Sequence, residues 1–448
     1  MKRNAKIGFV SLGCSKNLVD TERMLQLLAE AGYEIVAEDI EADVIIVNTC
    51  AFIESAKKES IESILDVAWL KENRSLKGII VTGCLAERYG KDVMNELLEV
   101  DGVLGVGSWD KIVEAVDTVL KGKQYYDHAD KNESELGGGR ILTTPFYTAY
   151  MKIAEGCDNC CTYCAIPMIR GKFRSRPMEE LIEEAKALEE SGVKELNLIA
   201  QDTSRYGLDL YGEYKLAELI HRITEETTIP WIRILYCYPD KITDELVAEM
   251  KNNPRLVKYI DLPIQHISDS MLKRMNRHGT SDDIKDAIKR LRENVPGIII
   301  RSTAIVGFPG ETEEDFEKLC QFVREVKFDR FGASPYSREE DTPAYDFADQ
   351  IDEQVKQDRY DILMREQLTV VEEQNEDKVG EIITVLLEDY DPVSEMFFGR
   401  SAADAPDIDG KIYFKAPRRL PLGSFVRVKI DEVLDYDLVG QYVGKETV

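Results

Sequence analysis

The sequence predicts an α/β protein of three units: a wound parallel-sheet domain, a partial (β/α)6 barrel and a small antiparallel β-barrel. Apolar runs alternate with amphipathic helical stretches over residues 1–120, and the alternation returns from residue 147 after a polar segment. From residue 378 onward, short strand-like runs are separated by Gly, Pro and Asp instead. We therefore place the domains at residues 1–136, 137–377 and 378–448.

In the first unit, strands are expected at residues 7–12, 43–48 and 78–82, and helices at 20–31, 53–72 and 86–99. Strands that alternate with helices form a parallel sheet whose faces the helices cover. Residues 121–141 are rich in Asp, Asn and Glu and contain three consecutive glycines, so this segment is predicted to be a linker.

The second unit is expected to contain six strands, fewer than the eight that close a complete β/α barrel. A charged helix is predicted at 351–376, and the terminal unit is expected to form a small antiparallel barrel. The second-unit strands are expected at 147–155, 195–200, 231–237, 259–264, 297–306 and 329–336. The terminal strands are expected at 379–387, 411–414, 425–430 and 438–443.

Composition narrows the function classes. No apolar run approaches the ~20 residues of a membrane span, and the basic start lacks the apolar stretch of a signal peptide. A cytoplasmic protein without a membrane partner is therefore expected. The formal net charge of −27 disfavours broad nucleic-acid binding and suits a basic protein partner. The alternative is that the acidity only keeps the protein in solution.

Three of the nine cysteines, Cys157, Cys161 and Cys164, form a C-x3-C-x2-C motif after the first predicted barrel strand. Active sites of barrels are built at that end of the strands. Three thiolates can hold three irons of a [4Fe–4S] cluster and leave the fourth iron open. A zinc site is the alternative, but a structural zinc requires a fourth ligand, and none is evident nearby. Cys160 falls outside this spacing.

Cys14, Cys50 and Cys84 each follow one predicted strand of the first unit. The carboxyl ends of the strands in a wound sheet open onto one crevice, so these thiols are expected to converge on a second cluster. The alternative is three buried, inert cysteines, since free Cys is common in protein cores. Cys237 and Cys320 belong to neither group of cysteines and are expected to be structural.

The C-x3-C-x2-C motif resembles that of radical S-adenosylmethionine enzymes, and the order of the three units resembles the methylthiotransferases of that superfamily, whose terminal barrel is the TRAM module. The resemblance covers essentially the whole chain. It implies that Cys157, Cys161 and Cys164 hold the radical [4Fe–4S] cluster and that Cys14, Cys50 and Cys84 hold an auxiliary one. It also implies two S-adenosylmethionine molecules, one to methylate a sulfur and one to supply the radical.

Polar residues and glycines at further strand ends are candidates for contacts with S-adenosylmethionine. Each has an ordinary alternative, because Pro-Gly pairs mark turns and polar residues open helices. No general acid or base can be assigned beyond the cluster ligands. The candidates are Gln201, Asp202, Gln265, Gly307 and Gly310, together with Arg170 just past the motif.

Two branches of the family compete: one modifies adenosine in transfer RNA, and the other an aspartate β-carbon of ribosomal protein S-twelve. Segments 11–22, 48–60 and 259–266 resemble the ribosomal branch. Residues 379–448 contain 8 Lys and Arg against 13 Asp and Glu, whereas a barrel that grips RNA should be basic.

We therefore predict an aspartate methylthiotransferase that acts on ribosomal protein S-twelve or the small ribosomal subunit, without transfer RNA as a partner. By analogy, a flavodoxin or ferredoxin supplies electrons, and a monomer is the default expectation. The alternatives are the transfer-RNA enzyme and a non-catalytic iron–sulfur or zinc sensor.

Overall fold

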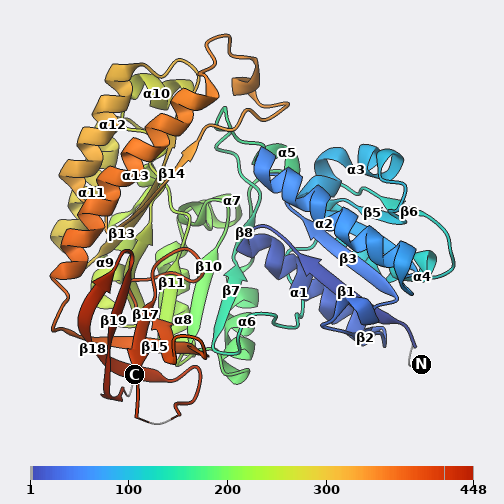
Figure 1. Ribbon diagram of the computed structural model, residues 1–448. Coiled ribbons are helices and arrows are strands. Elements are labelled where there is room, and N and C mark those ends of the chain that lie inside the picture. Colours follow the sequence, from blue (N-terminus) through green and yellow to red (C-terminus); the bar gives the residue numbers. More distant parts are fainter. Residues whose placement is uncertain (1–3, 418, 447–448) are drawn as a thin grey trace.

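The computed structural model describes residues 4–417 and 419–446, so the outermost predicted domain limits, residues 1 and 448, lie outside the described part. It contains three units in the predicted order (Figure 1). The N-terminal unit lies beside the central unit, and the terminal barrel packs against the central sheet. Within the described residues, no helix combines the length and the apolar character needed to cross a membrane.

The N-terminal unit is a six-stranded parallel sheet in the order β2-β1-β3-β4-β5-β6. Residues of β3 alternate between two apolar cores, so helices cover both faces of the sheet. The strands are β1 (Lys6–Ser11), β2 (Glu34–Ile35), β3 (Val44–Thr49), β4 (Gly78–Gly83), β5 (Gly102–Leu104) and β6 (Tyr125–Asp127). The helices are α1 (Ser15–Glu30), α2 (Glu54–Asn73), α3 (Cys84–Glu96) and α4 (Ile112–Val119).

The linker prediction is wrong over β6, which extends this sheet by pairing with β5. Tyr125 and Tyr126 favour strand structure and find an open sheet edge, and only the tertiary structure supplies that edge. The segment that follows is also tied down, because the Glu22 carboxylate of α1 accepts hydrogen bonds from Arg140 and from the backbone of Thr143.

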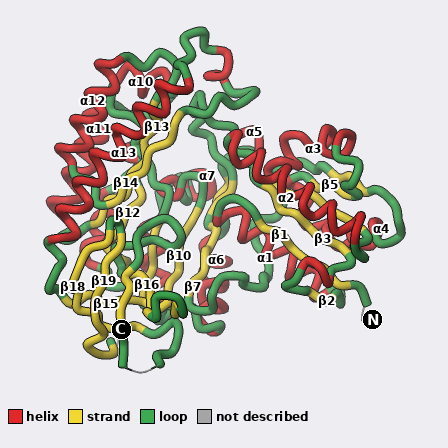
Figure 2. The backbone as a smooth tube through the Cα atoms, viewed as in Figure 1, coloured by secondary structure: helices red, strands yellow, loops and turns green. Residues whose placement is uncertain are grey.

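The central unit confirms the partial barrel: six parallel strands follow one another in sequence order in an open sheet, and helices cover its outer face (Figure 2). The strands are β7 (Thr148–Lys152), β10 (Glu195–Ile199), β11 (Trp231–Ile234), β12 (Leu256–Asp261), β13 (Ile299–Val306) and β14 (Arg330–Pro335). The helices are α6 (Met178–Glu190), α8 (Leu216–Glu226), α9 (Asp244–Asn252), α11 (Ser281–Asn294), α12 (Glu313–Val326) and α13 (Glu353–Glu376). Shorter elements are β8 (Ala154–Glu155), β9 (Arg174–Ser175), α5 (Ile166–Arg170), α7 (Leu208–Tyr211) and α10 (Asp269–Arg274).

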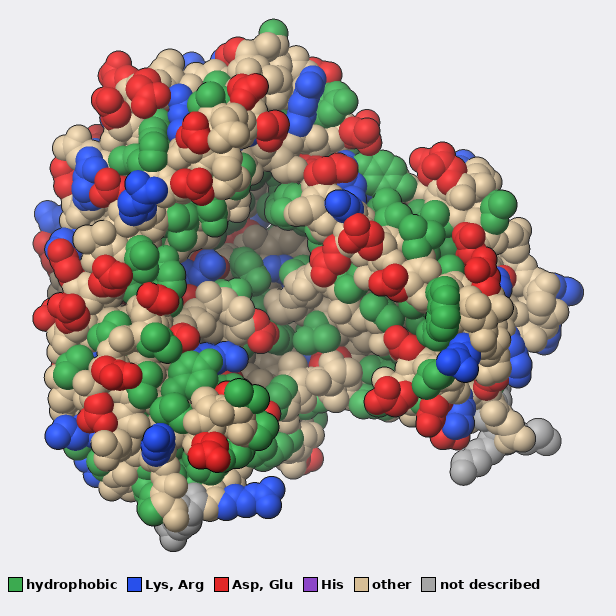
Figure 3. All heavy atoms as spheres, in the orientation of Figure 1, with side chains coloured by type: hydrophobic (Ala, Val, Ile, Leu, Met, Phe, Trp, Pro, Cys, Tyr) green, Lys and Arg blue, Asp and Glu red, His purple; other side chains and the backbone are tan. Residues whose placement is uncertain are grey.

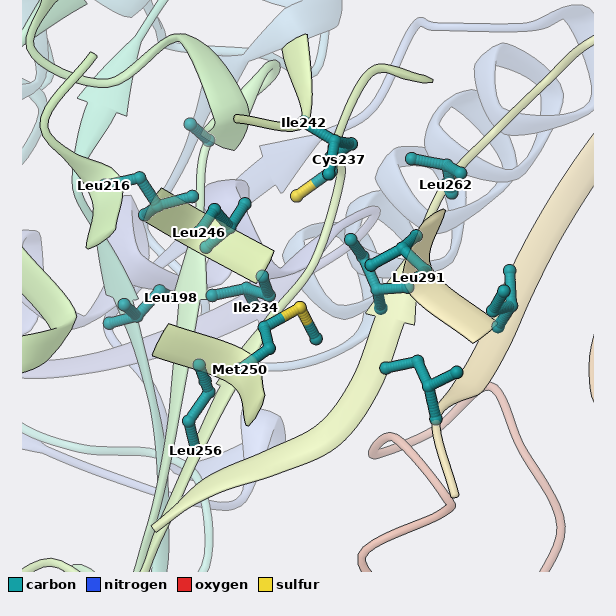
Figure 4. Close-up of a cluster of buried hydrophobic side chains, with 14 of the residues drawn as sticks. Leu198, Leu216, Ile234, Cys237, Ile242, Leu246, Met250, Leu256, Leu262 and Leu291 are labelled. Carbon is teal, nitrogen blue, oxygen red and sulfur yellow. The ribbon is translucent and has the colours of Figure 1, made fainter. Parts of the chain in front are cut away.

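The main apolar core lies between this sheet and its helices. Leu198 and Ile234 of the sheet pack with Leu246 and Met250 of α9 (Figure 4). Cys237 lies among these side chains, and Cys320 of α12 belongs to the same core, which agrees with a structural role for both.

The terminal unit is a closed barrel in the order β15-β16-β17-β19-β18, and the sequence did not predict β16. Its strands are β15 (Ile382–Asp391), β16 (Met396–Arg400), β17 (Ile412–Lys415), β18 (Phe425–Leu434) and β19 (Asp437–Lys445). The predicted small antiparallel barrel is confirmed, with one parallel pair where β17 and β19 meet. Five strands cannot alternate in direction around a closed ring, so one neighbouring pair has to be parallel.

The three units meet at the inner face of the central sheet. Val19 of α1, Trp231 of β11 and Phe425 of β18 belong to one buried cluster, and the rings of Trp231 and Phe425 are 4.9 Å apart. Buried ion pairs add to this contact, because Arg400 of the terminal barrel binds the Glu195 carboxylate at 2.6 Å.

Candidate functional site

The structure brings the three N-terminal cysteines to one edge of the sheet. Cys14, Cys50 and Cys84 follow β1, β3 and β4, which are neighbouring parallel strands. The strand order reverses between β1 and β3, the place where wound sheets bind ligands. Gly13 has φ +85°, and a Cβ there would lie 2.8 Å from Cβ of Cys50. The loops that carry Cys14 and Cys50 are therefore in direct contact.

The three thiols differ in how strongly nearby positive charges lower their pKa. Although Cys14 is accessible to solvent, surrounding protein partly desolvates it and would raise its pKa. Lys16 and Arg170 outweigh this effect and lower the pKa of Cys14. Burial raises the pKa of Cys50 to about 12. Burial also raises the pKa of Cys84, although Nη2 of Arg170 lies 3.7 Å from its Sγ.

The second set of cysteines lies in one loop after β8. Cys157 and Cys161 are buried, Cys164 is partly buried, and Cys160 is exposed. Gly156 precedes the motif with φ +78°, and a Cβ there would overlap the carbonyl oxygen of Lys172. A glycine with a left-handed backbone thus precedes the first cysteine of each set.

Polar side chains lie close to two of these thiols, one from the loop itself and one from the segment after β11. Asn159 Nδ2 lies 3.5 Å from Sγ of Cys157, and Tyr238 Oη lies 3.7 Å from Sγ of Cys161. Burial raises the pKa of Cys157 to about 11, and burial likewise raises the pKa of Cys164. Both thiols must therefore lose a proton when a metal binds.

A single metal ion needs several ligand atoms that converge on one point. In residues 4–417 and 419–446, no group of three or more His, Cys, Asp or Glu side chains is placed to hold one metal ion. Thiolates of an iron–sulfur cluster bind different irons and need not converge on one point. Two iron–sulfur clusters therefore do not require a site for a single ion.

Gln201 and Asp202 lie beside the cysteine loop, as the sequence suggested. Asp202 is fully buried and accepts hydrogen bonds from Asn159 (2.8 Å) and Lys241 (3.0 Å), so it anchors the loop. Gln201 donates to Glu155 at 2.9 Å, while its Oε1 is buried without a hydrogen-bond partner among the described residues. A buried acceptor without a partner fits a bound ligand that donates a hydrogen bond, such as the amino group of S-adenosylmethionine.

Contacts within the chain explain three other predicted cofactor residues, which are Gln265, Gly307 and Gly310. Gln265 has φ +67° and joins the end of β12 to β13 through backbone hydrogen bonds. A Cβ at Gly307 would overlap the Lys356 side chain of α13. A Cβ at Gly310 would overlap Asp349 and crowd the Arg274 guanidinium. Packing alone accounts for both glycines.

Sequence reasoning missed Glu311, which holds this turn in place. Its buried carboxylate accepts hydrogen bonds from the backbone of Gly307 at 2.6 Å and from Arg359 of α13 at 2.6 Å, and it lies 3.0 Å from His266 Nε2. A Glu four residues after a glycine at a strand end was the available signal.

The structure places Arg170 between the two sets of cysteines. Its guanidinium binds Asp20 at 2.5 Å, and it lies 3.7 Å from Sγ of Cys84. Lys152 bridges Asp20 and Glu155, with 2.5 Å to each carboxylate. Because Glu155 accepts from Gln201, a continuous buried network runs from Cys84 to the expected cofactor residues. Besides the predicted candidates Arg170 and Gln201, a lysine in the apolar run of β7 was a sequence sign of this network.

Figure 3 shows a hollow between the N-terminal and central units. Positively charged side chains lie inside it, although most charged groups on the surrounding surface are acidic. A negatively charged ligand group that enters this hollow would therefore meet cations rather than carboxylates.

Family models match three successive parts of the chain. Residues 151–323 match the Radical SAM superfamily, residues 6–105 the uncharacterized protein family UPF0004, and residues 379–443 the TRAM domain. Among solved structures, the radical S-adenosylmethionine methyltransferase TsrM from Kitasatospora setae is similar, with a TM-score of 0.57 and 15% identity over 77% of each chain. At that identity the likeness concerns the fold alone.

Relatives of known class match over nearly their whole length. The ribosomal protein uS12 methylthiotransferase RimO of Desulforamulus reducens is 50% identical over 97% of this chain and 99% of its own. RimO of Acetivibrio thermocellus is 47% identical over 99% of each chain. RimO of Clostridium botulinum is 50% identical over 97% of each chain. The chain therefore belongs to the RimO family of radical S-adenosylmethionine methylthiotransferases.

Proposed function

We propose that this chain transfers a methylthio group to the β-carbon of an aspartate in ribosomal protein uS12, with S-adenosylmethionine and two [4Fe–4S] clusters as cofactors. The observation that carries the proposal is a buried network across the interface between the two units that carry the cysteine sets. Cys84 of the N-terminal unit and Gln201 beside the central loop are linked by a single buried network. The near full-length identity to uS12 methylthiotransferases supports the substrate.

In this proposal Cys157, Cys161 and Cys164 hold the radical cluster, and Cys14, Cys50 and Cys84 hold the auxiliary cluster. When bound, these groups and the cofactor supply a radical that removes hydrogen from carbon, and a sulfur that carries the methyl group. Gln201 accepts a hydrogen bond from the cofactor's amino group through its free Oε1. The hydrogen bond between Asp202 and Asn159 holds the cysteine loop in place. Because Cys157 is buried, its thiol is shielded from water.

The net charge of the chain and the proposed reaction together suggest its partners. A formal net charge of −27 attracts a basic ribosomal protein and repels the phosphates of transfer RNA. A flavodoxin or ferredoxin is the proposed electron donor, and a monomer is the proposed state. A ribosomal substrate places the reaction in the cytoplasm.

Mass spectrometry of uS12 from cells with and without this gene tests the proposal. We expect one aspartate to carry SCH3 in place of hydrogen, and the deletion strain to lack this modification. If the modification persists in the deletion strain while methylthio-adenosine disappears from transfer RNA, the transfer-RNA alternative is correct. If neither changes and the purified protein binds one cluster or zinc, the sensor alternative is correct.

A further inference from the structure

Lys16 is an almost buried cation beside the N-terminal cysteines. It lies in the first turn of α1, two residues after Cys14, and only 7% of it is exposed. Its ammonium lies 3.1 Å from the centre of the Tyr236 ring. Tyr236 belongs to the central unit and follows β11, so Lys16 crosses the interface between the two units.

No carboxylate among the described residues forms an ion pair with this ammonium. Asp20, four residues along and on the same side of α1, is already bound by Lys152 and Arg170 at 2.5 Å each. The Tyr236 ring compensates only part of the lost hydration of an ammonium group. A buried cation without an anion is costly, so the site is suited to receive one.

The position of Lys16 relates it to both cysteine sets. Cys14 is the residue directly before α1, and Lys16 lies in the first turn of that helix. Tyr238, two residues after Tyr236, lies 3.7 Å from Sγ of Cys161 in the other set. Lys16 and Cys161, one from each unit, therefore contact neighbouring residues of one segment, which places the ammonium near the region where the two units meet. A substrate carbon that is reached from both sites has to enter this region.

We infer that Lys16 binds the side-chain carboxylate of the substrate aspartate and so selects a carboxylate-bearing substrate. The inference rests on the proposed function. The β-carbon of aspartate is bonded directly to its carboxylate, so a fixed carboxylate also fixes the position of the carbon that reacts. An ammonium–carboxylate contact is a charge-assisted hydrogen bond, which a neutral amide or a nucleobase cannot reproduce.

Equilibrium binding to the cluster-loaded, full-length protein tests this role without relying on turnover. The probes are uS12 with its target aspartate and the same protein with asparagine at that position. We expect the unchanged enzyme to bind the aspartate form about tenfold more tightly. Lys16→Met should abolish this preference by weakening the aspartate form alone, and Lys16→Arg should retain part of it. Lys58→Met, at an exposed lysine of α2, is the matched control and should retain the full preference.

Iron content and the absorption spectrum separate this role from support of the auxiliary cluster. With the proposed role, Lys16→Met keeps the iron and the spectrum of the unchanged protein. Equal weakening of both uS12 forms, with loss of iron, would instead assign Lys16 to the cluster and overturn the inference. An unaltered aspartate preference in Lys16→Met would overturn it as well. Failure of the unchanged enzyme to bind or modify uS12 would refute the proposed function itself, before any variant is compared.

Discussion

The two cysteine sites are built in different ways. Cys157, Cys161 and Cys164 belong to one loop, whose neighbours include the hydrogen-bonding side chains Asn159 and Tyr238. Cys14, Cys50 and Cys84 come from three loops of a wound sheet, and their nearest cations include one, Arg170, from the central unit. The first site is nearly complete within one stretch of chain, whereas the second depends on how two units pack.

This difference predicts which of the two sites a given substitution affects first. A change in the cysteine loop acts on its own site first, because its anchors, Asn159 and Asp202, belong to the same unit. A change in the interface acts on the N-terminal site, because Arg170 contacts both Asp20 and Cys84.

Loss of a cysteine should have the largest effect. We expect Cys157→Ala to abolish both methylthiolation of uS12 and the reductive cleavage of S-adenosylmethionine. Cys84→Ala should abolish methylthiolation and retain the cleavage, because the central loop keeps all three of its thiols. Each variant should bind about half of the iron of the unchanged protein. Chromatography of 5′-deoxyadenosine and the mass of uS12 check this; a Cys84→Ala protein that still modifies uS12 would contradict it.

Removal of Arg170 should have the next largest effect. Arg170→Met leaves Asp20 and Glu155 with Lys152 as their one remaining cation in the network, and breaking a buried ion pair costs about 3–5 kcal/mol of unfolding free energy. Urea unfolding should show this loss, and iron should be lost first from the N-terminal site. Arg222→Met, at a solvent-exposed ion pair with Glu226, is the control and should change the unfolding free energy far less, because water and salt screen such a pair. Equal losses in the two variants would refute a special role for this network.

The contact with the terminal barrel should respond to acid without involving either cysteine site. Burial would raise the pKa of Glu195, but Arg400 and Arg233 lower it to about 2. A carboxylate with a lowered pKa stabilises the fold fully above its ordinary pKa of 4.5, and this contribution of about 3 kcal/mol is lost as pH falls from 4.5 toward 2. Unfolding measured across this window should show the loss, and Glu195→Gln should remove that part of the pH dependence. An unchanged acid response in Glu195→Gln would contradict the assignment.

The glycines that precede the two sites offer the smallest and most closely matched comparison. Gly13→Ala and Gly156→Ala both place a side chain at a positive φ, which costs about 1–3 kcal/mol of unfolding free energy. We expect Gly13→Ala to reduce iron at the N-terminal site, because its Cβ would press on Cys50. Gly156→Ala should instead reduce cleavage of S-adenosylmethionine. Identical effects of the two variants on iron and on cleavage would show that the sites are not separable.

Local patterns were sufficient for much of the fold. Apolar alternation predicted β1, β3 and β4 and the six strands of the central sheet, because those segments are buried and bounded by turn residues. The short strands β2, β5, β6, β9 and β16 were missed. The first four have only two or three residues, too few to show a periodicity, and the strands beside them hold them in place. The parallel seam of the terminal barrel is likewise a consequence of closure rather than of any local signal.

The sequence by itself determined the cysteine loop, the order of the three units and the family that they resemble, because those properties depend on spacing along the chain. Only the tertiary structure decided the neighbours of the thiols. It placed Arg170 beside Cys84 and left Lys16 against the ring of Tyr236, with no ion-paired carboxylate among the residues that the structure describes. The physical reason is that the electrostatic environment of a side chain depends on the groups near it in space, whatever their distance along the chain. Residues 16, 170 and 236 come together only when two units bury a shared interface.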